Sequence, residues 1–331
     1  MRDTGCDSGY LSRVAISRSS MGQTQELTVH HFRLVIAVTK KLLLAFAALF
    51  GAVLFVRMLL LPGLQAIFHP DDSVTSLVRR TGIIVSAVLA YWAYVRIVEG
   101  RDASELRPAT RAIMLGGASG GLLMAISMLL ALALGAYEIS AYPGLQHGLL
   151  GIAGLIVIAA TLEEIAYRCI LFRILETAWG TVPALCLQSV IFALGHLENI
   201  EGRASMQELV TMIVSTTLTG ALWTLVFVLS RNLWAAAANH AAWNFTIILS
   251  GLPLSGIEDW RHMAPMAGEY RGPVWLTGGL FGPESSIVTI VMLAVTVAAM
   301  LYWAKRKNRL IGGAAWRVDT LKPLQPEARH A

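Results

Sequence analysis

The chain has 331 residues, of which 56% are apolar and only 14% are charged. A soluble domain of this size carries about a quarter charged residues, so the composition excludes an ordinary soluble globular protein. The formal net charge of +5 reflects 26 Lys and Arg against 21 Asp and Glu, and its excess gathers at residues 305–309. Such a basic run suits an anionic membrane surface better than nucleic acid. We therefore expect membrane lipid as a partner, and no nucleic acid.

The N-terminal segment is polar and carries scattered arginines among Ser and Thr. It lacks the short apolar stretch followed by small residues that marks a removable signal peptide. The first apolar block is therefore expected to stay in the membrane as an anchor.

Blocks of about 20 apolar residues follow, the length with which a helix crosses about 30 Å of hydrocarbon. They predict an all-α fold, a polytopic transmembrane helical bundle of about eight spans. The predicted spans lie near residues 42–62, 82–98, 113–136, 147–170, 183–198, 208–229, 232–250 and 286–303.

The distribution of Lys and Arg among the connecting segments predicts the orientation. Basic residues precede the first span and follow the second, fourth, sixth (Arg231) and eighth, whereas the loop around Glu138 has none. Short cytoplasmic loops collect Lys and Arg, so both termini are expected in the cytoplasm, N-in and C-in. Arg79 and Arg80 lie on the wrong side of this scheme.

Charged groups inside the fourth span are the first functional signal. An intramembrane carboxylate costs several kcal/mol and persists when it is paired or used. Glu164 and Arg168 are four residues apart on one helix face, so they can form an ion pair. Glu163 points about 100° away around the helix and has no evident local partner.

Two later spans carry further polar groups. The fifth ends at His196, and the seventh contains His240 and Asn244, which share a helix face. With about 1.5 Å per residue, these groups and Glu163 all fall between the inner third of the membrane and its midplane. Three helices thus present a Glu, two His and an Asn at compatible depth.

This combination of groups suits hydrolysis by an activated water. A desolvated Glu beside a His is a general-base pair, and a second His with an amide NH2 can donate hydrogen bonds to an oxyanion. No GxSxG, HExxH or paired-aspartate pattern of other intramembrane proteases lies in a span. The groups therefore indicate peptide-bond hydrolysis without a covalent intermediate.

Three motifs on successive helices carry a family resemblance: Glu-Glu-xxx-Arg at 163–168, Phe-xxx-His at 192–196 and His-xxx-Asn at 240–244. In this order they resemble the motifs of the CPBP (CAAX protease and bacteriocin-processing, or Abi) family, which includes the Ras-converting CAAX endoprotease of eukaryotes. Arg101 with Glu105-Leu106 is similar to an element often found ahead of the family core.

The resemblance implies a glutamic-type intramembrane endopeptidase that cleaves a membrane-anchored peptide or protein without a cofactor. It implies a multi-pass protein of the cell membrane, here expected to be a bacterial inner membrane. By this resemblance, Glu163 activates the water together with His196. Glu164 and Arg168 fix the site, and His240 and Asn244 form the oxyanion hole.

The expected organisation places this core between membrane anchors. Its parts are a polar cytoplasmic N-terminal segment (1–40), two transmembrane helices (41–100), the CPBP-like intramembrane protease core (101–250), a non-cytoplasmic loop (251–285), a last transmembrane helix (286–304) and a basic cytoplasmic tail (305–331). The loop has either a substrate-gating role or only that of an amphipathic surface segment.

Three alternatives stay open. Glu163, His196 and His240 could instead be ligands of a catalytic Zn2+, since two His and a carboxylate leave an open position. The same groups could form a proton relay in a proton-coupled transporter. Finally, the chain could be a non-catalytic membrane protein that acts by binding, for example in immunity against a bacteriocin.

Overall fold

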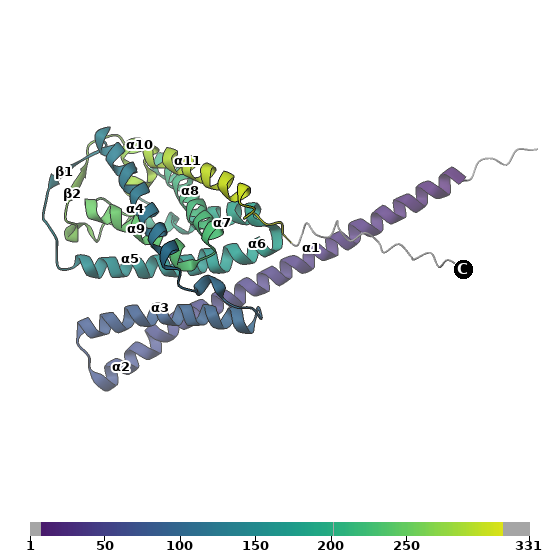
Figure 1. Cartoon of the computed structure of the whole chain (residues 1–331), viewed down its shortest axis with the longest axis horizontal. Helices are drawn as coiled ribbons and strands as arrows, with labels where there is room; N and C mark the ends of the chain where they lie inside the picture. Colours follow the sequence, from purple (N-terminus) through teal and green to yellow (C-terminus); the bar gives the residue numbers. More distant parts are fainter. Residues whose placement is uncertain (1–7, 201, 314–331) are drawn as a thin grey trace, which may run out of the picture.

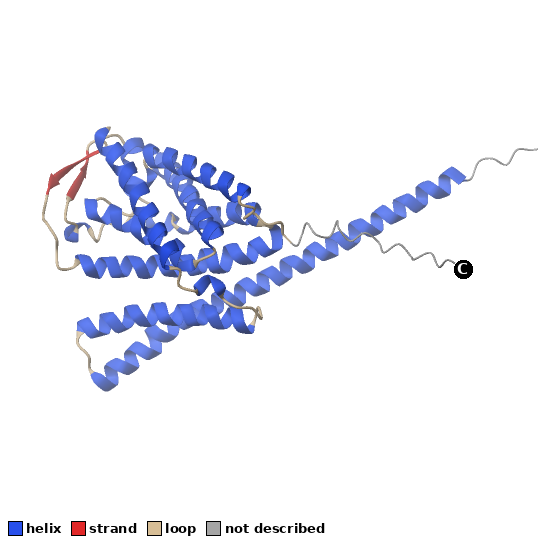
Figure 2. Ribbon diagram, viewed as in Figure 1, coloured by secondary structure: helices blue, strands red, loops and turns tan. Residues whose placement is uncertain are grey.

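The computed structural model describes residues 8–200 and 202–313, so parts of the predicted N-terminal segment and basic tail lie outside it. The fold is an all-α bundle with one short two-stranded ribbon (Figure 2). Its helices are α1 (Ser8–Phe55), α2 (Leu61–Phe68), α3 (Asp72–Ile97), α4 (Thr110–Ala133), α5 (Leu149–Glu164), α6 (Arg173–Trp179), α7 (Thr181–Gly195), α8 (Met206–Ser230), α9 (Leu233–Ser250), α10 (Val274–Thr277) and α11 (Ile287–Arg306).

Seven helical segments among the described residues are long and apolar enough to cross a membrane. This confirms the predicted polytopic bundle and makes the chain a multi-pass membrane protein. The segments are Val29–Phe68, Val74–Ile97, Thr110–Ala133, Leu149–Trp179, Thr181–Asn199, Met206–Ser230 and Ile287–Arg306.

Two predicted spans differ from the structure. The span expected at 232–250 is helix α9, but it is not one of the seven, because polar side chains such as Asn239 and His240 lower its hydropathy. The first span was expected to begin at residue 42, whereas helix α1 already begins at Ser8. The length of an apolar block predicts only the part of a helix that lies in lipid. It does not predict the polar turns with which α1 extends beyond it.

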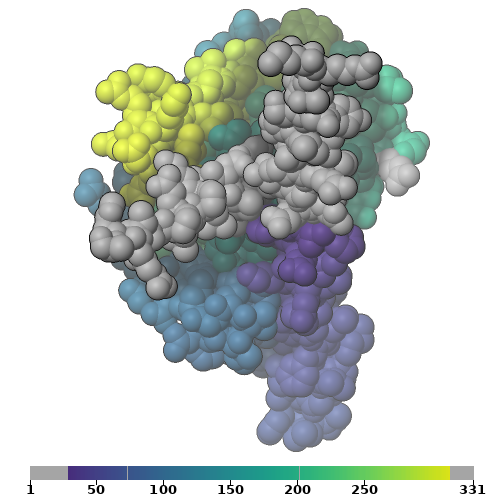
Figure 3. Space-filling model, turned by 90° about the vertical axis from the view of Figure 1, so that its right-hand side faces the viewer, coloured from purple at the N-terminus to yellow at the C-terminus, as the bar shows by residue number. Residues whose placement is uncertain are grey.

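Helices α1, α2 and α3 form a separate layer beside the core (Figures 1 and 3). A π-helical turn, Val56–Leu60, joins α1 to α2, and α3 returns antiparallel along α1. Arg80 on α3 donates to the carbonyl oxygen of Gly151 on α5 at 3.1 Å. This hydrogen bond gives a partner to one of the two arginines that did not fit the predicted orientation.

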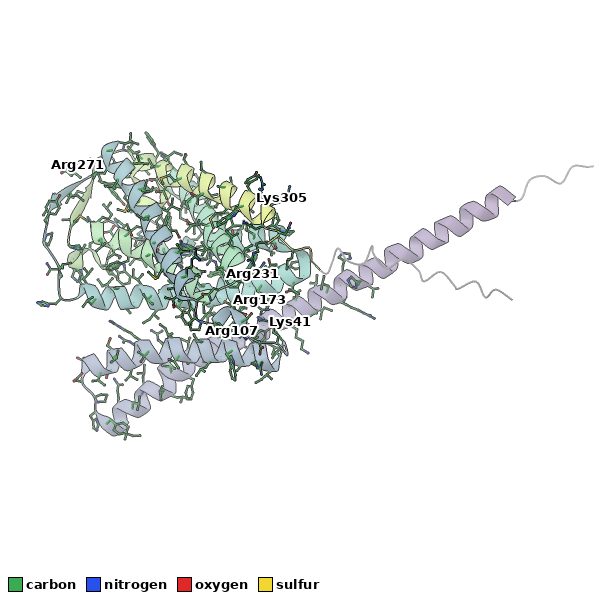
Figure 4. The ribbon with its side chains drawn as sticks, in the orientation of Figure 1. Lys41, Arg107, Arg173, Arg231, Arg271 and Lys305 are labelled. Carbon is green, nitrogen blue, oxygen red and sulfur yellow. The ribbon has the colours of Figure 1, made fainter. Side chains whose placement is uncertain are left out.

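The labelled basic residues Lys41, Arg107, Arg173, Arg231 and Lys305 lie toward the end of the bundle where α11 ends (Figure 4). Arg271 lies at the opposite end, as does the antiparallel ribbon of β1 (Tyr137–Ala141) and β2 (Ala267–Tyr270). The labelled basic residues thus gather mainly at one end of the bundle, and the N-in and C-in orientation stays a prediction of the positive-inside rule.

A partly buried ionic cluster joins the α1–α3 layer to the core near this basic end. Glu99 lies 2.7 Å from Arg173 and 2.8 Å from Arg101, and Arg101 lies 2.6 Å from Glu105. Burial alone would raise the pKa of Glu99, but the two arginines hold it below its usual range. The Arg101 and Glu105 element of the sequence therefore has a structural role, since it connects the α1–α3 layer to the core.

Helix α9 packs against α4 at unusually short range. At Gly116 and Gly120 a side chain would overlap the carbonyl oxygens of Ala235 and Asn239. Asn239 in turn donates to the Gly116 carbonyl at 3.0 Å and to Ser119 at 2.9 Å. Small residues that let helix backbones approach are typical of membrane helix pairs. The contact fixes the rotation of α9, and so the direction of its polar residues.

Replacing Gly120 tests this contact. Gly120→Ala should lower the stability of the detergent-solubilised protein by about 1–3 kcal/mol, because the added methyl group forces the two backbones apart. At the matched position Gly117 a Cβ meets its nearest atom at 3.8 Å, which is ordinary contact. Gly117→Ala should therefore melt like the wild type. Equal melting of all three proteins would contradict the close packing.

Candidate active site

The fourth span is one continuous helix with a change of pitch at the candidate site. Helix α5 ends at Glu164, a π-helical segment runs from Ile165 to Phe172, and α6 continues to Trp179. Such π-helical turns are rare and occur often at functional sites. Here the turn contains Arg168, whose side chain has no exposed surface.

Glu164 lies at the centre of the polar network. Its Oε1 is 3.0 Å from Nη1 of Arg168 and 3.0 Å from Nδ1 of His240. Arg168 also donates from Nη2 to the carbonyl oxygen of Gly220 at 3.1 Å. The structure thus forms the expected Glu164–Arg168 pair and adds His240 from α9 to it.

Aromatic rings surround these charges. The guanidinium carbon of Arg168 lies 4.8 Å from the ring centre of Phe192 and 5.4 Å from that of Trp223. Trp223 also stacks on His240, with ring centres 3.5 Å apart and an interplanar angle of 16°. The face of an aromatic ring attracts cations. The site is therefore arranged to hold positive charge away from water.

Glu163, His196, His240 and Asn244 line one cavity of about 120 Å3. This space has room for several water molecules. Oε2 of Glu163 lies 3.9 Å from Nε2 of His240. Four of the six predicted residues thus meet at one cavity, while Glu164 and Arg168 lie behind its wall.

The hydrogen bonds of the two histidines define their free nitrogens. Nδ1 of His196 lies 2.8 Å from the carbonyl oxygen of Phe192, which can only accept, so Nδ1 carries the hydrogen and Nε2 is a bare acceptor. Nδ1 of His240 faces the carboxylate of Glu164, so it also carries a hydrogen. His240 can therefore donate from Nε2 only as an imidazolium.

The outer wall of the cavity comes from a part of the chain that the sequence motifs do not mark. Ser255, Trp260, Phe281 and Glu284 all line it. The segment 251–285 is thus part of the site and does more than cover the surface. Neither spacing nor hydropathy distinguishes Glu284 in the sequence, since its burial depends on how this loop folds.

The alternative zinc site requires three ligands that converge on one point. Within residues 8–200 and 202–313, no three His, Cys, Asp or Glu side chains are placed to hold a metal ion. Glu163, His196 and His240 as placed therefore do not fit Zn2+, and we derive no step through a metal.

The bundle and its cavity define a multi-pass membrane protein with a partly buried Glu, His and Asn site. Residues 145–246 match the family model described as Rce1-like, the type II CAAX prenyl endopeptidases. This match covers all three motifs, so this segment of the chain is similar to the CAAX protease family that they predicted. Because this family is described as one of endopeptidases, the match supports proteolysis in the membrane as the activity. No curated protein matches the chain.

Adjacent glutamates should respond differently to the same change. Glu164→Gln leaves the buried Arg168 without its counter-charge, so it should destabilise the protein by about 3–5 kcal/mol. Glu163 is 34% exposed and lies farther from any cation, so Glu163→Gln should cost less than about 1 kcal/mol. Thermal unfolding in detergent measures both. Equal losses would contradict the division between a structural and a cavity-lining glutamate.

Proposed function

We propose that the chain is a glutamic-type intramembrane endopeptidase that hydrolyses a peptide bond in a membrane-associated protein or peptide. The observation that carries this proposal is the meeting of Glu163, His196, His240 and Asn244 at one cavity, although they come from three helices. The family match to residues 145–246 supports the same conclusion.

Water activation follows from the two acceptors in the cavity. A water between the Glu163 carboxylate and the bare Nε2 of His196 can donate one hydrogen to each, which turns an oxygen lone pair toward the substrate carbonyl. Glu163 then takes a proton as the oxygen attacks. His196 holds the water in place and keeps its own hydrogen on the Phe192 carbonyl.

Charge that develops on the carbonyl oxygen requires donors. The Nε2–H of a protonated His240 and the amide NH2 of Asn244 supply them from successive turns of α9. Glu164 stabilises the imidazolium through Nδ1, and Arg168 fixes Glu164. In this proposal Glu164 and Arg168 position the oxyanion donors and do not touch the substrate.

The substrate in this proposal is an anchored peptide that reaches the cavity from the membrane. A bacterial inner membrane is the proposed location, and no cofactor takes part.

The deciding experiment compares protein termini by mass spectrometry in cells that carry the wild type or Glu163→Ala at equal abundance. Loss of the base should reduce cleavage by about 100-fold or more, so specific termini should disappear in the variant. Glu269→Ala is the matched control, since this exposed glutamate lies on β2, outside the cavity.

Identical termini in both strains, with both chains folded in the membrane, would contradict proteolysis. They would favour the non-catalytic binding or immunity function. Proton-coupled solute flux that depends on Glu163 would instead favour the transporter.

Cleavage should also be independent of metal. The purified protein should keep its full rate in an excess of a strong chelator such as 1,10-phenanthroline, because water activation rests on Glu163 and His196 alone. The non-chelating 1,7 isomer is the control. A loss that only the chelator causes and that added Zn2+ reverses would restore the zinc alternative.

A further inference from the structure

Glu284 is an acid at the candidate site that belongs to none of the motifs. It lies in a 3-10 turn, Pro283–Ser285, just before α11 and outside the matched segment 145–246. Only 4% of its surface is exposed, and it lines the same cavity as Glu163 and His196. A buried carboxyl group at a cavity needs partners or a function.

The hydrogen bonds of Glu284 leave one position unfilled. Its Oε2 accepts from the backbone nitrogen of Ser255 at 2.9 Å and from the Ser255 hydroxyl at 2.8 Å. Its Oε1 accepts from Nε1 of Trp243 at 3.1 Å. Each carboxyl oxygen has two lone pairs, so these three donors leave a single lone pair, on Oε1.

The backbone around this acid is held in unfavourable conformations. Ser255 has φ of 50°, which is uncommon for a residue other than glycine. Gly282 has φ of 102°, and a side chain there would overlap the carbonyl oxygen of Pro253. Strained backbone collects at functional sites. The turn is thus built to place Glu284 opposite Ser255 at the edge of the cavity.

Among the described residues, no arginine or lysine forms a hydrogen bond or ion pair with Glu284. Glu164, in contrast, pairs with Arg168. Burial raises the pKa of Glu284 above its usual range, although its hydrogen bonds to Ser255 and Trp243 oppose this effect. A proton on this carboxyl group can occupy only the free lone pair on Oε1. Glu163 and Glu284 therefore have environments suited to opposite tasks, a base and an acid.

We propose that Glu284 is a further catalytic residue, the general acid that protonates the amine leaving group. The inference rests on the proposed function. Water adds to the carbonyl carbon while Glu163 takes one of its protons. As the C–N bond breaks, the nitrogen receives the proton of Glu284. The proton held by Glu163 then returns through water to Glu284, so the products are one carboxylic acid and one amine and both glutamates are restored.

An ester at the cleaved bond separates acid catalysis from a structural role. An alkoxide leaves more readily than an amine anion, so it depends less on proton donation. The probe is a synthetic peptide that spans a Glu163-dependent cleavage site, made once with the natural amide and once with an ester at that bond. With purified protein in detergent, Glu284→Gln should lower kcat for the amide by about 100-fold and for the ester by less than about 10-fold.

Glu208→Gln is the matched control. Glu208 is also buried and accepts from the backbone nitrogen of Leu280 at 3.0 Å, so it holds the same outer segment, but it does not line the cavity. This variant should leave the ratio of amide to ester rates unchanged. Melting temperatures show whether each variant is folded.

Two results would overturn the inference while leaving the proposed function intact. The first is an unchanged amide rate in Glu284→Gln. The second is an equal loss for amide and ester, which would make Glu284 a purely structural link between the loop and α9. If Glu163→Ala itself leaves all termini and both rates unchanged, the proposed function fails and this inference fails with it.

Discussion

One carboxylate oxygen, Oε1 of Glu164, lies 3.0 Å from both a guanidinium and an imidazole nitrogen inside the bundle. A single negative charge does not balance Arg168 and a protonated His240 in a medium that excludes water. The second negative charge is supplied by Glu163, 3.9 Å from the other nitrogen of His240. The four groups are neutral together when Glu163 is ionised and His240 is protonated, and they stay neutral when this proton moves from His240 to Glu163. Electroneutrality therefore allows the protonation states that the proposed mechanism requires.

This balance depends on how helix α9 is held. A turn of only two residues, Arg231 and Asn232, connects α8 to α9, and Asn232 caps the new helix by accepting from Ala235 at 3.1 Å. The glycines of α4 fix the opposite face of α9 at close range. Both constraints fix the backbone of α9, and stacking on Trp223 holds the His240 ring against Glu164. Precise placement of this kind is what preorganised electrostatic catalysis requires.

Sequence alone could predict the spans and the six motif residues, because apolar length and charges inside apolar blocks are local signals. It could also predict the Glu164–Arg168 pair, which depends only on helical spacing. It could not predict that His240 joins this pair, that Arg80 finds the Gly151 carbonyl, or that Glu284 is buried. These contacts join residues about 70 or more positions apart, or depend on an irregular loop, so no periodicity in the chain encodes them.

The outer wall of the cavity and the motif helices are separate stretches of the chain. The wall is one contiguous piece, tied down by the pairing of β2 with β1, which precedes the motif helices. This piece runs between two fixed anchor points, the end of α9 and the start of α11, and it carries Glu284. Substitutions in this piece that spare Glu284 would therefore change the surface that meets a bound peptide and leave the charged interior unaltered.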